Sequence, residues 1–430
     1  MTLNILVAPS GFKECISATA AAKAIVAGVR RAMPEACISA VPMADGGEGF
    51  TETLVEATGG MRHACCVSDP LGRPVPATLG LIGDPGERTA VIEIAQAAGL
   101  RLLRPDERNM LRASSLGVGQ LIRVALDLGA RRILIGCGDS GVNDGGAGLA
   151  QALGARFFDH EGRELGGTPD DLLRLARIDI SGLDRRLGTT RIDVAVNWQN
   201  ALLGPRGVTR VYGPQKGVSP DQVEKLEAAL ATYARCIREA TGIDVATESG
   251  AGASGGIGAA LAGLCGARLH PRLDIVKQVF AFDARLRDAD LVITAEGTLD
   301  WQTPLGKIPA EIGRCAKALG IPVLVLAGAA GEGAEASLAH GITAFQSVVR
   351  GPCAREDSMK NAATLLETAA EQTMRTFVAG LKVGRRRAMA KISAPGPAPM
   401  APTLGCIARD NATTFPDKKR KSMSRINALA

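Results

Sequence analysis

The feature that most constrains the fold is the stretch at residues 131–149, in which a short apolar run leads directly into a glycine-rich polar loop. Residues 133–135 are Ile-Leu-Ile, with charge before them and glycine after them, which predicts a buried parallel strand. Glycines at 136, 138 and 141 allow a tight turn, and a helix is expected to begin near Ala147. Such a unit is a potential anion site, because free backbone N–H groups and the helix dipole face the loop.

The polar residues of this loop have two interpretations, and the sequence leaves both open. Asp144 is a carboxylate suited to Mg²⁺ or to a substrate hydroxyl. Alternatively, Asn143 and Asp144 only cap the following helix.

The same order of strand, acidic glycine loop and helix occurs twice more. Residues 38–43 predict a strand, and Asp45 and Glu48 follow it among glycines before a helix that ends near Ala57. Residues 291–294 predict another buried strand, which runs into Glu296 and Asp300. Ligands of open α/β sheets bind at the carboxyl ends of the strands, so these loops are expected to form the site.

The middle of the chain has a different pattern. Residues 61–82 alternate between apolar and polar, and residues 70–74 (Pro-Leu-Gly-Arg-Pro) read as a hairpin turn. This predicts a second, more mixed sheet. With 430 residues, two domains are expected.

Charge and composition limit the classes of function. The net charge is +6, but residues 385–430 carry ten Lys/Arg against two acids, which leaves the remainder at −2. We therefore expect a disordered basic tail at 385–430 and a nearly neutral body with no nucleic-acid partner. No apolar run is long enough to span a membrane and no signal peptide is recognisable, so no membrane partner is expected. The ten cysteines are scattered, as in a reduced cytoplasmic protein.

Acids at strand ends, glycine loops and spaced lysines suit phosphoryl transfer. Mg²⁺ takes carboxylate oxygens, phosphates take N–H groups and lysine charge, and an acceptor hydroxyl needs a base. Lys13, Lys216 and Lys307 each lie beside glycine or in a polar loop. The alternative for each lysine is a solvated surface charge.

Several motifs, in order, resemble those of the bacterial type-1 glycerate kinases, from about residue 3 to residue 381. The quoted motifs are Ala8-Pro9-Ser10-Gly11-Phe12-Lys13, Pro42-Met43-Ala44-Asp45-Gly46-Gly47-Glu48-Gly49, Asn143-Asp144-Gly145-Gly146-Ala147-Gly148, Gly213-Pro214-Gln215-Lys216-Gly217 and Glu296-Gly297 with Asp300, Gln302-Thr303 and Gly306-Lys307. The resemblance implies Mg²⁺- and ATP-dependent phosphorylation of D-glycerate, giving 2-phosphoglycerate, by a cytoplasmic monomer or homodimer.

The resemblance also implies the architecture. The fold class is α/β, with a discontinuous Rossmann-like parallel-sheet domain (1–62 and 288–384), an inserted mixed-sheet α/β domain (63–287) and the active site in the cleft between them.

The resemblance extends to individual site residues. The implied catalytic residues are Asp45, Asp144, Glu296 and Lys13, with Asp144 and Glu296 also holding the metal. The implied substrate- and ATP-binding residues are Ser10, Gly46, Gly47, Glu48, Gly138, Ser140, Asn143, Gly145, Asn197, Lys216, Asp300, Thr303 and Lys307.

The chain departs from the family pattern at three places. Ser10-Gly11 stands where the family usually has Asp-Ser, and Asn197 and Asn200 stand where it often has acids. The family's Gly-Gly-Ser-Ala-Thr-Asn reads Gly138-Asp139-Ser140-Gly141-Val142-Asn143. Amides hydrogen-bond but cannot serve as bases, so the departures concern the acceptor more than the reaction class.

Three other functions are compatible with parts of this sequence. A kinase of a related hydroxy acid shares all these features. A nicotinamide-dependent oxidoreductase would use Gly136, Gly138 and Gly141 as its glycine fingerprint, but residues 155–164 offer no clear strand that ends in the required acid. A non-catalytic binding protein would use its basic tail to recruit nucleic acid or an anionic membrane.

Overall fold

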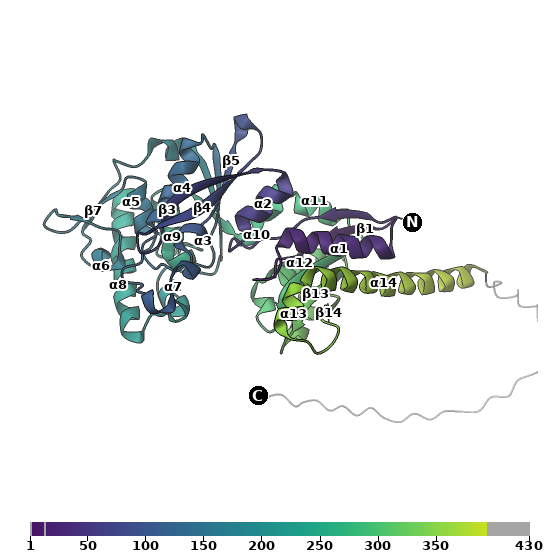
Figure 1. Ribbon diagram of the computed structural model, residues 1–430. Coiled ribbons are helices and arrows are strands. Elements are labelled where there is room, and N and C mark those ends of the chain that lie inside the picture. Colours follow the sequence, from purple (N-terminus) through teal and green to yellow (C-terminus); the bar gives the residue numbers. More distant parts are fainter. Residues whose placement is uncertain (1, 13, 394–430) are drawn as a thin grey trace, which may run out of the picture. The chain divides into compact units, whose positions relative to one another are not determined.

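The first sheet joins the two ends of the sequence. In the computed structural model, which describes residues 2–12 and 14–393, five parallel strands lie in the order β14-β13-β12-β1-β2 (Figure 1). Their bounds are β1 Asn4–Val7, β2 Cys37–Ala40, β12 Leu291–Leu299, β13 Val323–Ala330 and β14 Ala344–Ser347. In β1, Ile5 pairs with Ile38 on one side and with Leu291 on the other. The predicted parallel sheet is therefore confirmed.

The second sheet is mixed, as predicted. Its six strands lie in the order β11-β10-β6-β5-β4-β3. Their bounds are β3 Met61–Ser68, β4 Pro74–Ile82, β5 Thr89–Glu93, β6 Arg132–Gly136, β10 Arg191–Val196 and β11 Arg268–Pro271. From β5 to β11 the neighbouring strands are parallel, whereas β4 runs antiparallel to both β3 and β5.

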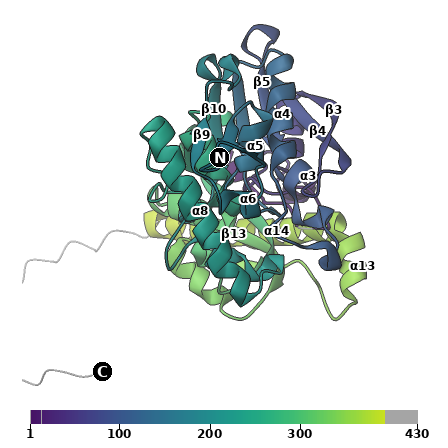
Figure 2. The same cartoon turned by 90° about the vertical axis from the view of Figure 1, so that its left-hand side faces the viewer.

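A small antiparallel sheet, in the order β8-β7-β9, completes the set of strands. Its bounds are β7 Arg156–Phe158, β8 Glu164–Leu165 and β9 Arg177–Asp179. Helix α8 (Pro220–Thr241) contacts β9 and the short helix α6 (Pro169–Leu172) in this part of the molecule (Figure 2). The ring of Phe157 in β7 meets the buried ring of Tyr233 in α8 edge to face.

The helices pack on the sheets with their apolar faces. The remaining α-helices are α1 Ala18–Ala32, α2 Phe50–Thr58, α3 Ala95–Ala98, α4 Leu116–Asp127, α5 Ala147–Ala152, α7 Val208–Tyr212, α9 Ala253–Gly263, α10 Arg272–Val279, α11 Phe282–Arg287, α12 Ile308–Lys317, α13 Arg355–Lys360 and α14 Ala362–Ser393. Short 3₁₀ turns lie at Pro85–Glu87, Leu100–Leu102, Pro105–Glu107, Arg185–Thr189, Pro214–Lys216, Thr303–Leu305 and Ala334–His340.

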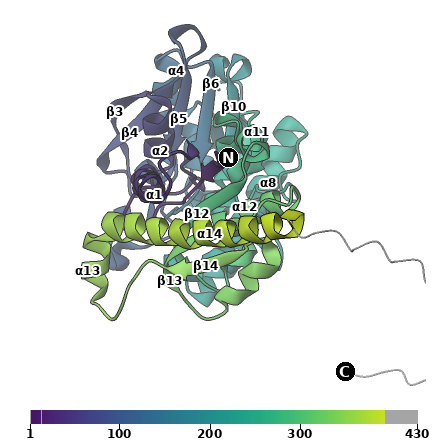
Figure 3. The same ribbon diagram turned by 90° about the vertical axis from the view of Figure 1, so that its right-hand side faces the viewer.

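One face of the first sheet is covered by α1 and the part of α14 up to Val378 (Figure 3). Ser17 caps α1 by accepting a hydrogen bond from the Ala20 N–H group. The two helices cross closely at Gly28, where a Cβ would lie 2.0 Å from the Glu367 carbonyl oxygen. This crossing ties the C-terminal helix to the N-terminal strand.

A continuous apolar cluster links the two large sheets. It contains Leu6 and Val292 from the first sheet, Val91 and Leu134 from the second, and Phe50 of α2, all buried. Helices α10, α11 and α12 contribute further members of this cluster. Because one core serves both sheets, α2 and α10 hold the strand ends of the first sheet near those of the second.

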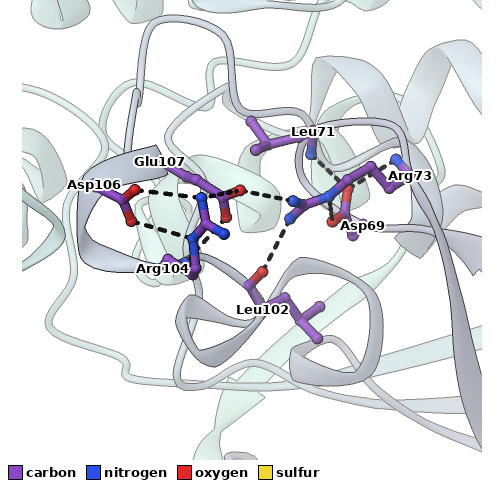
Figure 4. A network of polar contacts seen from close by, with 7 residues as sticks. All are labelled: Asp69, Leu71, Arg73, Leu102, Arg104, Asp106 and Glu107. Atoms are coloured by element: carbon purple, nitrogen blue, oxygen red, sulfur yellow. Dashed lines mark hydrogen bonds and ion pairs between the residues drawn. The ribbon is translucent and has the colours of Figure 1, made fainter.

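The predicted hairpin turn at residues 70–74 is confirmed and lies in a polar network (Figure 4). Asp69 accepts hydrogen bonds from the Leu71 and Arg73 N–H groups and pairs with the Arg73 guanidinium group, which also contacts Glu107. The network anchors the segment at residues 100–108, which carries two of the arginines described below.

The structure divides the chain into units at a different place from the sequence prediction. The residues up to Val378 form one unit, which contains all three sheets, and residues 379–430 form a second. The boundaries 62/63 and 287/288 of two domains stay a prediction. Helix α14 continues to Ser393, past the predicted start of the tail, and residues 394–430 lie outside the described part of the chain. None of the described helices is both long and apolar enough to cross a membrane.

Candidate active site

A cavity of about 990 Å³ lies where the carboxyl ends of the two large sheets approach each other. The segments that follow β1, β2 and β12 line one side, and the segments that follow β6, β10 and β11 line the other. This is the location expected for ligands of α/β sheets.

The cavity brings most of the predicted site residues together. Those that line it are Ser10, Asp45, Gly47, Glu48, Gly138, Ser140, Asn197, Lys216, Glu296 and Lys307. Among the described residues, the predicted ones that do not line it are Gly46, Asn143, Asp144, Gly145, Asp300 and Thr303. Lys13 lies outside the described residues.

Glu296 is the carboxyl group best suited to act as a base. It projects from β12, and the Ser10 hydroxyl group lies 3.0 Å from its Oε2 atom. The pKa of Glu296 is raised to about 7, mainly by burial and also by the nearby charge of Asp45, whereas Ser10, Lys307 and Arg272 oppose the shift. A carboxyl group that titrates near neutral pH is well matched to proton transfer.

Asp45 faces the same cavity in a more exposed position. Its side chain is 44% exposed, and its Oδ1 atom accepts a hydrogen bond from the Gly47 N–H group at 3.3 Å. The guanidinium group of Arg272, at the start of α10, lies 3.6 Å from its Oδ2 atom. The oxygens of Asp45 are thus directed toward the cavity and partly neutralised by one arginine.

Lys307 is held at the start of α12. Its Nζ atom donates to Oδ1 of Asp300 at 3.0 Å and to the Thr298 carbonyl oxygen at 3.2 Å. Thr303 Oγ1 accepts a hydrogen bond from the Asp300 N–H group. Asp300 and Thr303 therefore support Lys307 from outside the cavity.

Lys216 occupies the opposite side of the cavity. It is only 3% exposed, and its Nζ atom donates to Ser140 Oγ at 3.0 Å and to the Val142 carbonyl oxygen at 2.7 Å. Burial lowers the pKa of Lys216 to about 8, although the charge of Asp144 acts in the opposite direction. A buried ammonium group of this kind suits an anionic ligand.

Asp144 is buried beneath the glycine-rich loop instead of facing the cavity. It is 0% exposed, and its carboxylate accepts hydrogen bonds from the Ser115 N–H and hydroxyl groups and from the N–H groups of Gly146 and Gly148. Burial raises the pKa of Asp144, and these hydrogen bonds oppose the shift. The geometry favours the helix-capping interpretation over a metal or substrate contact.

Asn143 is also buried, and its amide nitrogen donates to Thr209 Oγ1 at 2.9 Å. Three successive residues at the start of α9, Ser254 to Gly256, adopt left-handed conformations next to it. A Cβ at Gly255 would lie 2.0 Å from the Val142 carbonyl oxygen, so the close contact requires glycine. The loop after β6 and the start of α9 form one wall.

Sequence reasoning missed three arginines that line the cavity, Arg101, Arg108 and Arg272. Arg101 pairs with Glu48 at 3.0 Å, and the Nε atom of Arg108 is buried without a hydrogen-bond partner in the structure. None of them lies in a recognisable motif, and Arg272 only follows a short edge strand. No signal in the sequence places them here.

The acidic side chains of the cavity can be compared with the ligands that Mg²⁺ requires. No group of three or more His, Cys, Asp and Glu side chains within the described ranges could hold a metal by itself. Mg²⁺, however, commonly uses one or two carboxylates together with substrate phosphates and water. Asp45 and Glu296 fit that requirement, since both line the cavity and their charges interact. Asp144 does not, because protein donors occupy both of its oxygens.

The fold and the cavity define the class first: an α/β protein with a polar cavity between two sheets, in which carboxyl groups lie beside cationic side chains. Comparison with known proteins then gives the family. The sequence model of the glycerate kinase family matches residues 5–378, and the chain belongs to this family. It is therefore an enzyme, a kinase.

The relatives cover nearly the whole described chain. A glycerate kinase of Bacillus subtilis (strain 168) is 43% identical over 89% of this chain and 99% of its own. A glycerate 2-kinase of Escherichia coli (strain K12) is 40% identical over 88% of this chain and 99% of its own. A crystal structure of a Salmonella typhimurium LT2 protein, provisionally described as glycerate kinase 2, matches with a TM-score of 0.78 at 43% identity, over 88% of this chain and 99% of that one.

Proposed function

We propose that the enzyme transfers the terminal phosphoryl group of ATP to D-glycerate in the cavity, giving 2-phosphoglycerate and ADP, with Mg²⁺. The observation that carries this proposal is Glu296, a carboxyl group with a pKa of about 7 that shares the cavity with Asp45 and several cations. The names of the relatives, glycerate kinase and glycerate 2-kinase, supply the acceptor and its 2-hydroxyl.

The residues divide the work as follows. Glu296 accepts the proton of the acceptor hydroxyl as the oxygen attacks phosphorus, and the Ser10 hydroxyl orients its carboxylate. Lys307 and Arg272 stabilise the charge of the transferring phosphoryl group, and Lys216 and Arg108 bind an anionic end of a substrate on the opposite wall. Asp45 and Glu296 would hold Mg²⁺ together with the nucleotide, and the ion would supply positive charge against the phosphates.

Location, oligomeric state and the choice of acceptor complete the proposal. A cytoplasmic location agrees with the nine described cysteines, all of which are free. The protein is proposed to act as a monomer or homodimer. The family match leaves the oxidoreductase alternative without support, whereas a related hydroxy acid as acceptor remains the second candidate because Asn197 and Asn200 depart from the family pattern and line the cavity.

A single assay tests the proposal. ADP release is coupled to a spectroscopic readout over a panel of hydroxy acids with and without Mg²⁺, and ³¹P NMR identifies the product. Turnover that depends on D-glycerate and gives 2-phosphoglycerate is expected. Turnover with another hydroxy acid alone would transfer the reaction to that acceptor, and no ADP release with any acid would overturn the proposal.

A further inference from the structure

Three successive backbone N–H groups of the loop after β2 each donate to a different carboxylate. The Gly47 N–H group donates to Asp45 Oδ1 at 3.3 Å, that of Glu48 to Asp139 Oδ2 at 3.0 Å, and that of Gly49 to Glu93 Oε2 at 2.9 Å. The loop follows the first sheet, whereas Glu93 ends β5 and Asp139 follows β6, both in the second sheet. The N–H groups at the N-terminus of α2 are thus bonded to carboxylates of the protein itself.

The loop also lies directly on the backbone of the second sheet. A Cβ at Gly138 would lie 2.5 Å from the Gly47 Cα atom, and a Cβ at Gly47 would lie 2.4 Å from Asp139 Oδ2. Asp139 itself adopts a left-handed conformation with φ of 50°. The close contact between Gly47 and Gly138 therefore brings the N–H donors of the loop within hydrogen-bonding distance of the carboxylates.

Glu93 is a buried carboxyl group that does not line the cavity. It is 2% exposed, and the described residues that line the cavity do not include it. Its carboxylate lies at the positive end of the α2 dipole, which favours the charged form, although burial is the stronger influence and raises the pKa of Glu93 to about 7. Asp45 lies a few residues before α2, and its side chain is bonded to the same loop through Gly47.

We infer that Glu93 is a positioning residue for catalysis: together with Asp139 it holds the loop of residues 45–49 against β5 and β6, and so fixes the Asp45 carboxylate in the cavity near Glu296. This inference rests on the proposed function in one respect only, since its kinetic test measures the phosphorylation of glycerate. Without the carboxylate of Glu93, the loop loses one of its two hydrogen bonds to carboxylates at or just after strand ends of the second sheet, and Asp45 is no longer held in one place.

The test uses Glu93→Ala and the conservative Glu93→Gln in the full-length protein. Asp159→Ala is the matched control, since Asp159 is a buried carboxylate that accepts N–H groups of Glu161 and Arg163 at 2.9 Å in the small sheet, outside the cavity lining. At pH 8.5, Glu93→Ala is expected to lower kcat about tenfold, with the KM for ATP changed less than about twofold. Glu93→Gln, which keeps an acceptor oxygen, is expected to lose less, and Asp159→Ala nothing.

Two further measurements separate positioning from general stabilisation. In an Asp45→Asn background, Glu93→Ala should add less than about twofold, because the group that it positions is already altered. Amide hydrogen exchange should accelerate in residues 46–53 and stay unchanged elsewhere. An equal cost in both backgrounds, or unchanged kcat in folded Glu93→Ala, would overturn the inference; if Glu93→Ala does not fold, Glu93→Gln carries the same comparison.

The exchange measurement needs no turnover, so the two proposals fail separately. If the wild-type protein does not phosphorylate glycerate while exchange in 46–53 still responds to Glu93→Ala, only the proposed function is wrong. If glycerate is phosphorylated but neither exchange nor kcat responds, only the positioning inference is wrong.

Discussion

The loops after β2 and β6 share one sequence pattern and put their aspartates to opposite uses. In the first loop the N–H groups of Glu48 and Gly49 are satisfied by Asp139 and Glu93 from other segments, and Asp45 faces the cavity. In the second loop the N–H groups of Gly146 and Gly148 are satisfied by the loop's own Asp144, which is fully buried. An acidic residue in a glycine loop is therefore available for chemistry only where another group satisfies the backbone around it.

The largest expected effect comes from removing the base on the cavity side of this comparison. Glu296→Gln keeps the shape of the side chain but cannot accept the proton, so kcat should fall by about 10²–10³. Steady-state kinetics with ATP and D-glycerate varied separately measure it. A loss of less than fivefold would transfer the role of base to another carboxylate that lines the cavity, such as Asp45.

The same residue sets the pH dependence. Glu296 must be ionised to accept a proton, and its pKa is about 7, so kcat/KM of the wild type should fall about tenfold per pH unit below pH 7. Glu93 has a similarly raised pKa of about 7, mainly through burial, so Glu93→Gln is the control for its contribution to this limb.

The sign of the stability effect follows from the same pKa. Because the pKa of Glu296 in the folded state lies above its ordinary value of 4.5, its stabilising contribution is complete below pH 4.5 and is lost as the pH rises through 7. Glu296→Gln should therefore be at least as stable as the wild type at pH 8, as measured by urea unfolding. A clear loss of stability there would contradict the assignment of a raised pKa.

The next effect concerns the cations beside Asp45 and Glu296. Lys307→Ala should lower kcat/KM about 10- to 50-fold, because the ammonium group faces a partly exposed cavity and strengthens its contact as phosphoryl charge develops. Asp300→Asn is the matched variant, since it removes the charged partner of Lys307 but keeps the ammonium group and its bond to the Thr298 carbonyl oxygen, and it should cost less. A defect confined to the KM for glycerate would instead place Lys307 at the acceptor carboxylate.

A smaller effect is expected on the buried side of the comparison. Ser115 donates its N–H and hydroxyl groups to Asp144, and its Oγ atom accepts from the Leu149 N–H group. Ser115→Ala should lower the free energy of unfolding by about 1–2 kcal/mol and leave kcat of the folded enzyme within about threefold. A large loss of kcat without a loss of stability would show that Asp144 acts in the reaction.

The smallest effect is expected from a change that touches neither loop. Truncation after Gly384 removes the rest of α14 and the basic segment, and kcat/KM should stay within about twofold. A tenfold loss, measured under the same conditions, would mean that the C-terminal segment contributes to the cavity.

The sequence predicted what depends on local pattern. Short apolar runs predicted β6 and β12, and the Pro-Leu-Gly-Arg-Pro turn predicted the hairpin between β3 and β4. Ten of the predicted site residues line the cavity because strand ends of parallel sheets gather their loops.

The sequence could not predict the roles of residues whose partners lie far away in the chain. Whether Asp144 faces a ligand is determined by Ser115, which lies at the start of another helix, and the pattern around Asp144 contains no trace of it. Arg272 reaches Asp45 only because α10 packs into the core shared by the two sheets. The roles of such residues can be recognised only in the folded structure, where the two sheets lie together.

The most direct test compares Asp45→Asn with Asp144→Asn in one experiment, with kcat and thermal unfolding measured on the same preparations. The account predicts that Asp45→Asn lowers kcat by about 10² or more with an unchanged Tm. It predicts that Asp144→Asn lowers the free energy of unfolding by about 1–3 kcal/mol, because an amide donor replaces an acceptor of four hydrogen bonds, while kcat of the folded protein falls less than about tenfold. The reverse result, an inactive but fully stable Asp144→Asn and an active Asp45→Asn, would contradict it.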